Sequence, residues 1–305
     1  MNYVELIPRF LLGLLFQWWG PLLAIVAFAV LVIARRAPRT EIAPFTRRVA
    51  LLGGLAIAVS WALMQLAPMF ASEPWRVMWW LTLPPVVIAS ASVAIILVHI
   101  LRTRSTHEVP VTPVVRRGWL SFTRRRDWVA TASAVVTLLA LTVAAGLASS
   151  PDDDGLYSRI SIPVGDQGAG SSTFFGWAYS VPLLIATVVL LVLLYLALRS
   201  NASRPFLRPE TVGAETEQRR DTSVVLFALA GASILIGLSD AVIMVAHAGL
   251  GSVGVGIPGV GTFMYSTGFA SLAPALLVIG SLLQFWAALW LLLTISARRL
   301  AGRAR

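Results

Sequence analysis

The sequence predicts an all-α fold, a polytopic bundle of transmembrane helices, and three observations support this class. Of the 305 residues, 57% are hydrophobic and only 12% are charged, whereas about a quarter of the residues of soluble domains are charged. The mean hydropathy is +0.81. About seven apolar stretches are also long enough to cross a bilayer, because about 30 Å of hydrocarbon requires about twenty residues of helix. We therefore expect residues 1–305 to form a single integral membrane domain.

The predicted spans are bounded by arginine, proline, glycine or acidic residues. Their approximate limits are 10–34, 49–71, 77–101, 128–148, 175–198, 223–246 and 269–296. Residues 18–39 and 178–205 share an aromatic residue, a Pro-Leu-Leu segment and a basic exit. This similarity raises the hypothesis of a three-one-three repeat, in which spans one to three correspond to spans five to seven.

Four prolines lie inside or near the ends of these spans. A proline within a helix removes one backbone hydrogen bond and clashes with the preceding turn, so Pro21, Pro84, Pro85 and Pro274 are the predicted kinks. The first span has a second interpretation, in which residues 4–17 lie flat in the membrane interface and the span begins after them.

The arginines predict the orientation. All 24 basic residues are arginine. Loops 35–48, 102–126 and 199–222 carry five, seven and five of them, and the tail after Ala297 carries four. Cytoplasmic loops retain positive charge, so the N-terminus is expected outside and the C-terminus in the cytoplasm of a cell that carries the chain in its cytoplasmic membrane.

The net charge of +10 therefore belongs mainly to the predicted cytoplasmic face. We expect it to interact with anionic lipid headgroups, at about 1 kcal/mol for each arginine near the surface. Because these arginines lie where stop-transfer boundaries place them, we do not expect nucleic acid as a partner. A cytoplasmic protein partner and a homo-oligomer both remain open.

The composition also excludes several chemistries. The chain has no cysteine and no lysine, which removes disulfides, thiolate metal sites, cysteine nucleophiles and Schiff-base cofactors. The three histidines are not spaced as metal ligands in the sequence. We therefore expect no metal, no cofactor and no enzymatic activity. An intramembrane hydrolase in which Ser239, Ser252 or Ser266 approaches His247 is the weakest alternative.

Asp240 and His247 are the polar residues that stand out, because both lie in or at the edge of the sixth span. They are seven residues apart, two helical turns, so they share one face of the helix. A lipid-facing aspartate costs about 2.5–3.5 kcal/mol, so this face is expected to meet protein or water. Arg76 and Arg159 are the predicted ion-pair partners on the outer side. The pair has two interpretations: a structural ion pair, or the handling of ions or protons.

Two outer segments carry further patterns. Residues 249–261 match Gly-x-Gly-x-x-Gly twice, but the soluble strand and helix of a dinucleotide site are missing from the pattern. A flexible outer connection is the main interpretation, and a re-entrant or gating loop is the alternative. Residues 149–174 contain three consecutive aspartates, which predict a solvated acidic turn, followed by alternation that suggests a short strand.

The sequence does not predict a substrate. The favoured function is a transport-type membrane component, a permease or carrier, in which Asp240 and His247 line an outer vestibule. The second hypothesis is a membrane anchor or regulatory subunit whose arginine-rich loops dock a cytoplasmic partner such as an ATPase.

Overall fold

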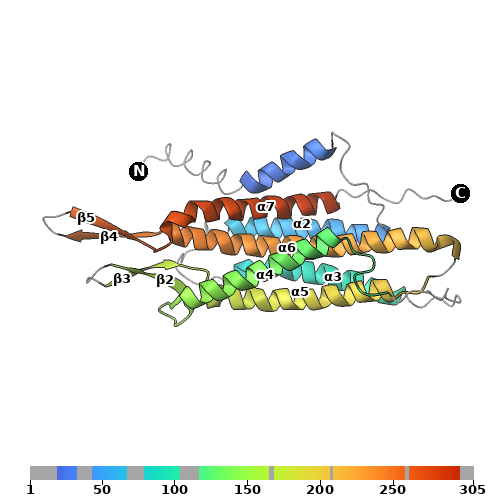
Figure 1. The fold of residues 1–305 in the computed structure, drawn as a ribbon, viewed down its shortest axis with the longest axis horizontal. Helices are drawn as coiled ribbons and strands as arrows, with labels where there is room; N and C mark the ends of the chain where they lie inside the picture. Colours follow the sequence, from blue (N-terminus) through green and yellow to red (C-terminus); the bar gives the residue numbers. More distant parts are fainter. Residues whose placement is uncertain are drawn as a thin grey trace.

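The computed structural model describes residues 19–32, 43–66, 79–103, 117–164, 168–206, 209–257 and 261–295. Long helices lie side by side, and two small antiparallel sheets stand at one end of the bundle (Figure 1). The long helices are α2 (Pro44–Leu66), α3 (Pro84–Arg102), α4 (Arg125–Ala148), α5 (Trp177–Ser203), α6 (Val212–Leu250) and α7 (Ala273–Ile295). Short 3-10 helices are η2 (Trp79–Thr82), η4 (Pro209–Thr211) and η5 (Ala270–Leu272).

Six helices in the described part of the chain are long and apolar enough to cross a membrane, and the protein is therefore a membrane-embedded helical bundle. A shorter apolar helix, Trp19–Val32, corresponds to the described part of the first predicted span. The rest of that span, residues 10–18 and 33–34, lies outside the described residues, as does residue range 4–17, so both interpretations of this region stay predictions.

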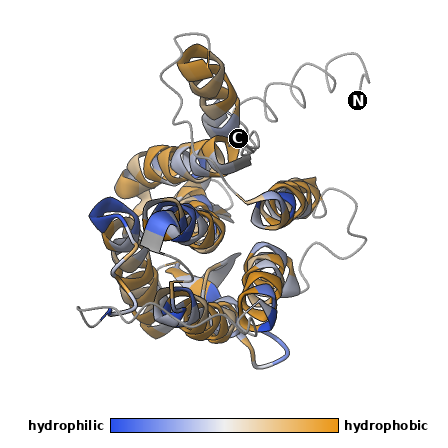
Figure 2. Ribbon diagram, turned by 90° about the vertical axis from the view of Figure 1, so that its right-hand side faces the viewer, coloured by the Kyte–Doolittle hydropathy of each residue, from blue (hydrophilic) through white to orange (hydrophobic). Residues whose placement is uncertain are grey.

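The outer surface of the bundle is apolar, as a lipid environment requires. Large aliphatic side chains point outward on several helices, including Leu63, Val136, Ile185, Val188 and Val278, each more than half exposed. Water would make such a surface costly, whereas hydrocarbon does not. In Figure 2, viewed from the end opposite the sheets, the helices are mostly hydrophobic.

Helix α6 is the central element of the bundle. In its most apolar stretch 83% of the residues are buried, against 33–39% in the other five long helices. It contacts α2, α3, α4, α5 and α7. Small residues permit this enclosure: a Cβ atom on Gly231 would meet the ring of Trp290 in α7 and the hydroxyl of Thr131 in α4. Close approach through small residues is the usual way in which membrane helices pack.

Most of the prolines predicted to bend helices lie at helix starts instead. Pro84 and Pro85 are the first residues of α3, and Pro274 is the second residue of α7. A proline in the first turn has no helical hydrogen bond to lose, so these residues start helices and do not bend them. Pro21 lies in the first turn of the described part of its helix, and its kink stays a prediction. Pro182, which is not among the predicted kinks, does lie inside a helix, α5.

The predicted all-α bundle is supported, and two small sheets accompany it at one end. Strands β1 (Ser150–Pro151), β2 (Tyr157–Pro163) and β3 (Ala169–Thr173) form one antiparallel sheet, and β4 (Ser252–Ile257) and β5 (Gly261–Ser266) form a hairpin. The short strand expected after the aspartates is confirmed as β2. The two sheets pack against each other at Gly170 in β3 and Val253 in β4. The contact is close, because a Cβ atom added to Gly170 would touch the Val253 side chain.

The glycine-rich segment is therefore not a flexible connection or a re-entrant loop over its described residues. Its glycines alternate with Val and Ile along β4, and Ile257 pairs with Gly261 at the turn. Gly261 has a φ of 124°, which an L side chain rarely adopts. Alternation of small and β-branched residues fits a strand, and this pattern outweighed the usual association of glycine with loops.

Candidate functional site

Asp240 lies on the central helix α6, ten residues before its last residue, Leu250. At 1.5 Å for each residue this is about 15 Å from the helix end. The surrounding residues of α6 are almost all apolar and buried. The side chain points toward α2, which presents two polar groups at the same level.

Both of these groups belong to one face of α2. Trp61 and Gln65 are four residues apart, so they lie one above the other on the helix. The indole Nε1 of Trp61 donates a hydrogen bond to Asp240 Oδ1 at 3.3 Å, and Nε2 of Gln65 donates to the same oxygen at 2.9 Å. Two neutral donors therefore fix one carboxylate oxygen of Asp240.

The second oxygen, Oδ2, is left open. Among the described residues it accepts no hydrogen bond, and no arginine or histidine forms an ion pair with the carboxylate. The residue is partly exposed. A carboxylate held by neutral donors on one oxygen and open on the other can accept a proton or a cation.

Packing against α7 and α5 holds this part of α6 in place. The hydroxyl of Ser239, which is fully buried, donates to the carbonyl oxygen of Gly280 in α7 at 3.0 Å. A Cβ atom on Gly280 would meet Ile243, and one on Gly237 would lie 3.3 Å from Leu183 of α5. These close contacts fix the height and rotation of α6, and therefore the direction of Asp240.

His247 does not join Asp240 in the structure. It lies two turns closer to Leu250, the last residue of α6, its side chain is exposed, and its carbonyl oxygen accepts a hydrogen bond from the Gly251 amide. No hydrogen bond between the two side chains occurs among the described residues. The site is therefore built from Asp240, Trp61 and Gln65, and the role of His247 in a vestibule stays a prediction.

Of the two arginines predicted to pair with Asp240, one has a different partner and the other lies outside the described residues. Arg159, in β2, forms its ion pair with Asp153, with Nη2 2.9 Å from Oδ2. Strand β2 lies in the sheet at the end of the bundle. Arg76 lies outside the described residues, and its pairing with Asp240 stays a prediction.

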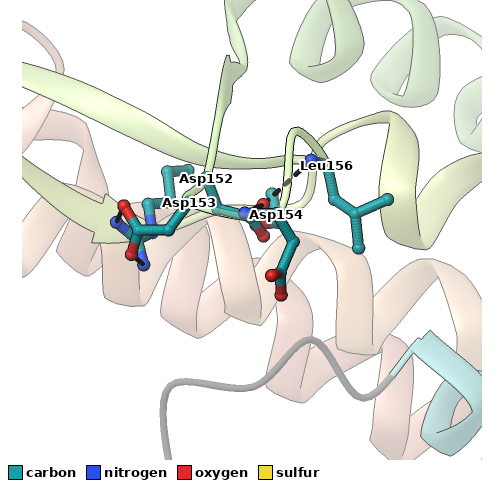
Figure 3. A network of polar contacts seen from close by, with 6 residues as sticks. Asp152, Asp153, Asp154 and Leu156 are labelled. Atoms are coloured by element: carbon teal, nitrogen blue, oxygen red, sulfur yellow. Dashed lines mark hydrogen bonds and ion pairs between the residues drawn. The ribbon is translucent and has the colours of Figure 1, made fainter.

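The three aspartates form the turn between β1 and β2, as the sequence predicted (Figure 3). Asp152 organises it: its Oδ1 accepts hydrogen bonds from the amides of Asp154 at 3.0 Å and Leu156 at 2.8 Å, and its Oδ2 accepts one from the Ser158 hydroxyl at 2.6 Å. Partial burial alone would raise the pKa of this carboxyl, but these hydrogen bonds and the nearby Arg159 guanidinium outweigh it. The pKa therefore lies below its usual value, and the cluster is a structural turn.

The serines suggested as nucleophiles have other partners. Ser239 donates to the α7 backbone. Ser252 and Ser266 face each other across the β4–β5 hairpin. Within the described ranges, no group of three His, Asp or Glu side chains could hold a metal ion.

Sequence reasoning found Asp240 but missed Trp61 and Gln65. The available signal was the segment Trp-Ala-Leu-Met-Gln near the end of an otherwise apolar span, since two polar groups at a spacing of four indicate one polar face. No protein-family model matches the chain, and neither do the curated proteins or solved structures with which it was compared. Any function assigned to the site therefore has to come from its geometry.

Proposed function

We propose that this membrane protein is a transport-type component, a permease or carrier, and that Asp240 binds the proton or cation that it handles. The observation that carries the proposal is that only one of the two carboxylate oxygens of Asp240 accepts hydrogen bonds. Oδ1 is held by Trp61 and Gln65, whereas Oδ2 has no partner among the described residues. Oδ2 is therefore the atom at which a proton or a cation can bind.

The position of the carboxylate within an apolar bundle supports the same interpretation. A charged side chain within a span costs about 2.5–3.5 kcal/mol on insertion scales, and such residues commonly mark ion or proton pathways. The two α2 donors are neutral, so they orient the carboxylate without cancelling its charge. A proton or a cation from outside the protein supplies the missing positive charge.

Reversible binding also needs a site that is neither sealed nor fully hydrated. Asp240 is partly exposed, whereas its neighbours Ser239 and Ala241 are buried. In this proposal α2 is the helix that responds to occupancy, because Trp61 and Gln65 contact the carboxylate directly. Protonation of Asp240 weakens both hydrogen bonds, since hydrogen bonds to charged groups are about twice as strong as neutral ones.

The proposal is tested by proton flux into liposomes. The purified chain is reconstituted with a pH-sensitive dye in the lumen, and a potassium diffusion potential drives protons inward. We expect acidification with the natural protein and a loss to the level of protein-free liposomes with Asp240→Asn. Asp154→Asn is the matched control, because the same acid-to-amide change is made at an exposed residue of the acidic turn.

A second measurement covers a chain that moves another cation or requires an unidentified substrate. Thermal unfolding midpoints in lipid nanodiscs are compared across pH and between sodium and choline salts. Binding at Asp240 makes the midpoint depend on protons or on sodium, and Asp240→Asn removes that dependence. If neither flux nor the unfolding midpoint distinguishes Asp240→Asn from Asp154→Asn, the transport proposal is wrong.

A further inference from the structure

A second polar cluster lies at the opposite end of the bundle from the sheets, where α5 leads into α6. Arg219, in the second turn of α6, is 5% exposed. Its Nη1 donates to the carbonyl oxygen of Arg204 at 2.7 Å, and its Nη2 donates to that of Pro205 at 2.8 Å and to Glu215 Oε2 at 3.4 Å. This guanidinium is therefore a structural group whose role is to hold the 204–206 connection against α6.

Arg117 differs from Arg219 in its partners. Its guanidinium carbon lies 3.9 Å from the centroid of the Phe206 ring, and that of Arg219 lies 4.3 Å from the same centroid. Arg117 is only partly buried, and within the described part of the chain its guanidinium forms no hydrogen bond or ion pair. A guanidinium in cation–π contact with a ring, whose N–H groups form no hydrogen bond within the described part of the protein, can donate to a planar or tetrahedral anion.

Several charged side chains lie near this ring. Arg117, Arg204 and Arg219 interact electrostatically, and Glu215 is the acid whose charge reaches Arg219. Arg204 comes from the end of α5 and donates from Nη2 to Thr103 Oγ1 at the end of α3, at 2.7 Å. These guanidinium groups carry like charges, so an anion bound close to them would reduce their mutual repulsion.

Two aromatic side chains place this cluster at the depth of lipid headgroups. Trp119, two residues after Arg117, is 42% exposed. It packs edge-on against Tyr195 of α5, with ring centroids 5.8 Å apart. Exposed Trp and Tyr side chains concentrate at the interface between hydrocarbon and water. Arg117 therefore lies where the phosphate groups of a bilayer lie.

We propose that Arg117, stacked on Phe206, binds the phosphate of an anionic lipid headgroup. Arg219 serves as the platform beneath it, because its own donors are already used within the protein. The chemistry recognised is a phosphate oxygen pair, and the source is lipid because the interfacial aromatic pair adjoins the site. This inference is independent of the proposed role of Asp240, which lies on the outer half of α6.

Native mass spectrometry of the full chain, released from detergent micelles, tests the proposal. Phosphatidylglycerol and phosphatidylcholine are added separately, and inorganic phosphate is added as a competitor. We expect phosphatidylglycerol to bind with at least about tenfold preference over phosphatidylcholine, and Arg117→Gln to weaken its binding by about tenfold or more, the loss of one charge-assisted interaction. Arg125→Gln is the matched control, because it removes one exposed arginine at the same end of the bundle.

Each remaining outcome overturns a defined part of the proposal. Equal weakening by Arg117→Gln and Arg125→Gln would show attraction by net charge alone, without a site. Displacement of phosphatidylglycerol by inorganic phosphate at similar concentrations would assign the site to free phosphate. If Arg117→Gln does not fold, the comparison of the two lipids on the natural chain still decides, since a lack of preference refutes the proposal.

Discussion

Replacement of Gly231 by alanine adds only one methyl group, but it should destabilise the bundle relative to the same change at an open position of α6. Gly231 lies in the buried part of α6, where the helix passes between α4 and α7. A methyl group there would lie 2.5 Å from Cη2 of Trp290 and 2.9 Å from Oγ1 of Thr131. Carbon atoms pack best at about 3.5–4.0 Å, so α6 and its neighbours would have to separate by about 1 Å.

The expected magnitude follows from two opposing terms. Extra methyl groups in a well-packed interior cost about 1–3 kcal/mol, whereas alanine favours a helix over glycine by about 1 kcal/mol. Gly213 lies in the first turn of the same helix, and a methyl group added to it would have no neighbouring atom within 4 Å. Gly213→Ala therefore gains the helical term alone. Because Gly231→Ala gains the same term, it cancels in the comparison, and the two variants should differ by about 1–3 kcal/mol in the free energy of unfolding.

The assay is unfolding of the purified chain in mixed micelles by titration with dodecyl sulfate, followed by helical circular dichroism. A second variant tests the mechanism: Trp290→Phe removes the ring atoms that Gly231→Ala meets. The double variant should recover part of the loss, with a coupling of about 0.5–3 kcal/mol. If Gly231→Ala is as stable as Gly213→Ala, the interior around α6 is looser than the structure indicates, and the reasoning is refuted.

Two further predictions concern the end of the bundle that carries the sheets. Because hydrogen bonds lower the pKa of Asp152, its contribution to the β1–β2 turn is present above the unfolded pKa of about 4 and is lost as the pH falls through the lower folded value. A lower protection factor of the Leu156 amide, that is, exchange closer to the intrinsic rate at the same pH, on acidification, and at all pH values in Asp152→Asn, would confirm this. The chain has no natural cysteine, so a membrane-impermeant thiol reagent applied to intact cells should label Ser171→Cys and spare Ala214→Cys. The reverse pattern would invert the predicted orientation.

The helices were predictable because their signal is local. A run of about twenty apolar residues has few alternatives to a helix in a bilayer, and most predicted limits lie near the observed ends. The exception is α6, which begins at Val212 and not near residue 223. Its first turns carry charges, so hydropathy does not detect them, but Glu215 and Arg219 pair at a spacing of four and support the helix there.

The candidate site was only half predictable, for a related reason. A single aspartate in an apolar span is visible in the sequence, but its partners depend on which helix lies beside α6. Trp61 and Gln65 are 179 and 175 residues away from Asp240 along the chain. Charge alone pointed to arginine as a partner, whereas the packing of α2 against α6 supplies neutral donors at that height. The prolines were misjudged because their effect depends on where each helix begins.

The enclosure of α6 has a consequence for biosynthesis. Four of the five helices that surround it precede it in the chain, and only α7 follows. In the order of synthesis α6 therefore precedes one of its partners, and the Ser239 hydroxyl has no Gly280 carbonyl to bind until α7 has been made. Completion of the enclosure thus depends on α7, and we expect a nascent chain halted before residue 273 to leave one side of its innermost helix uncovered and open to quality-control proteases.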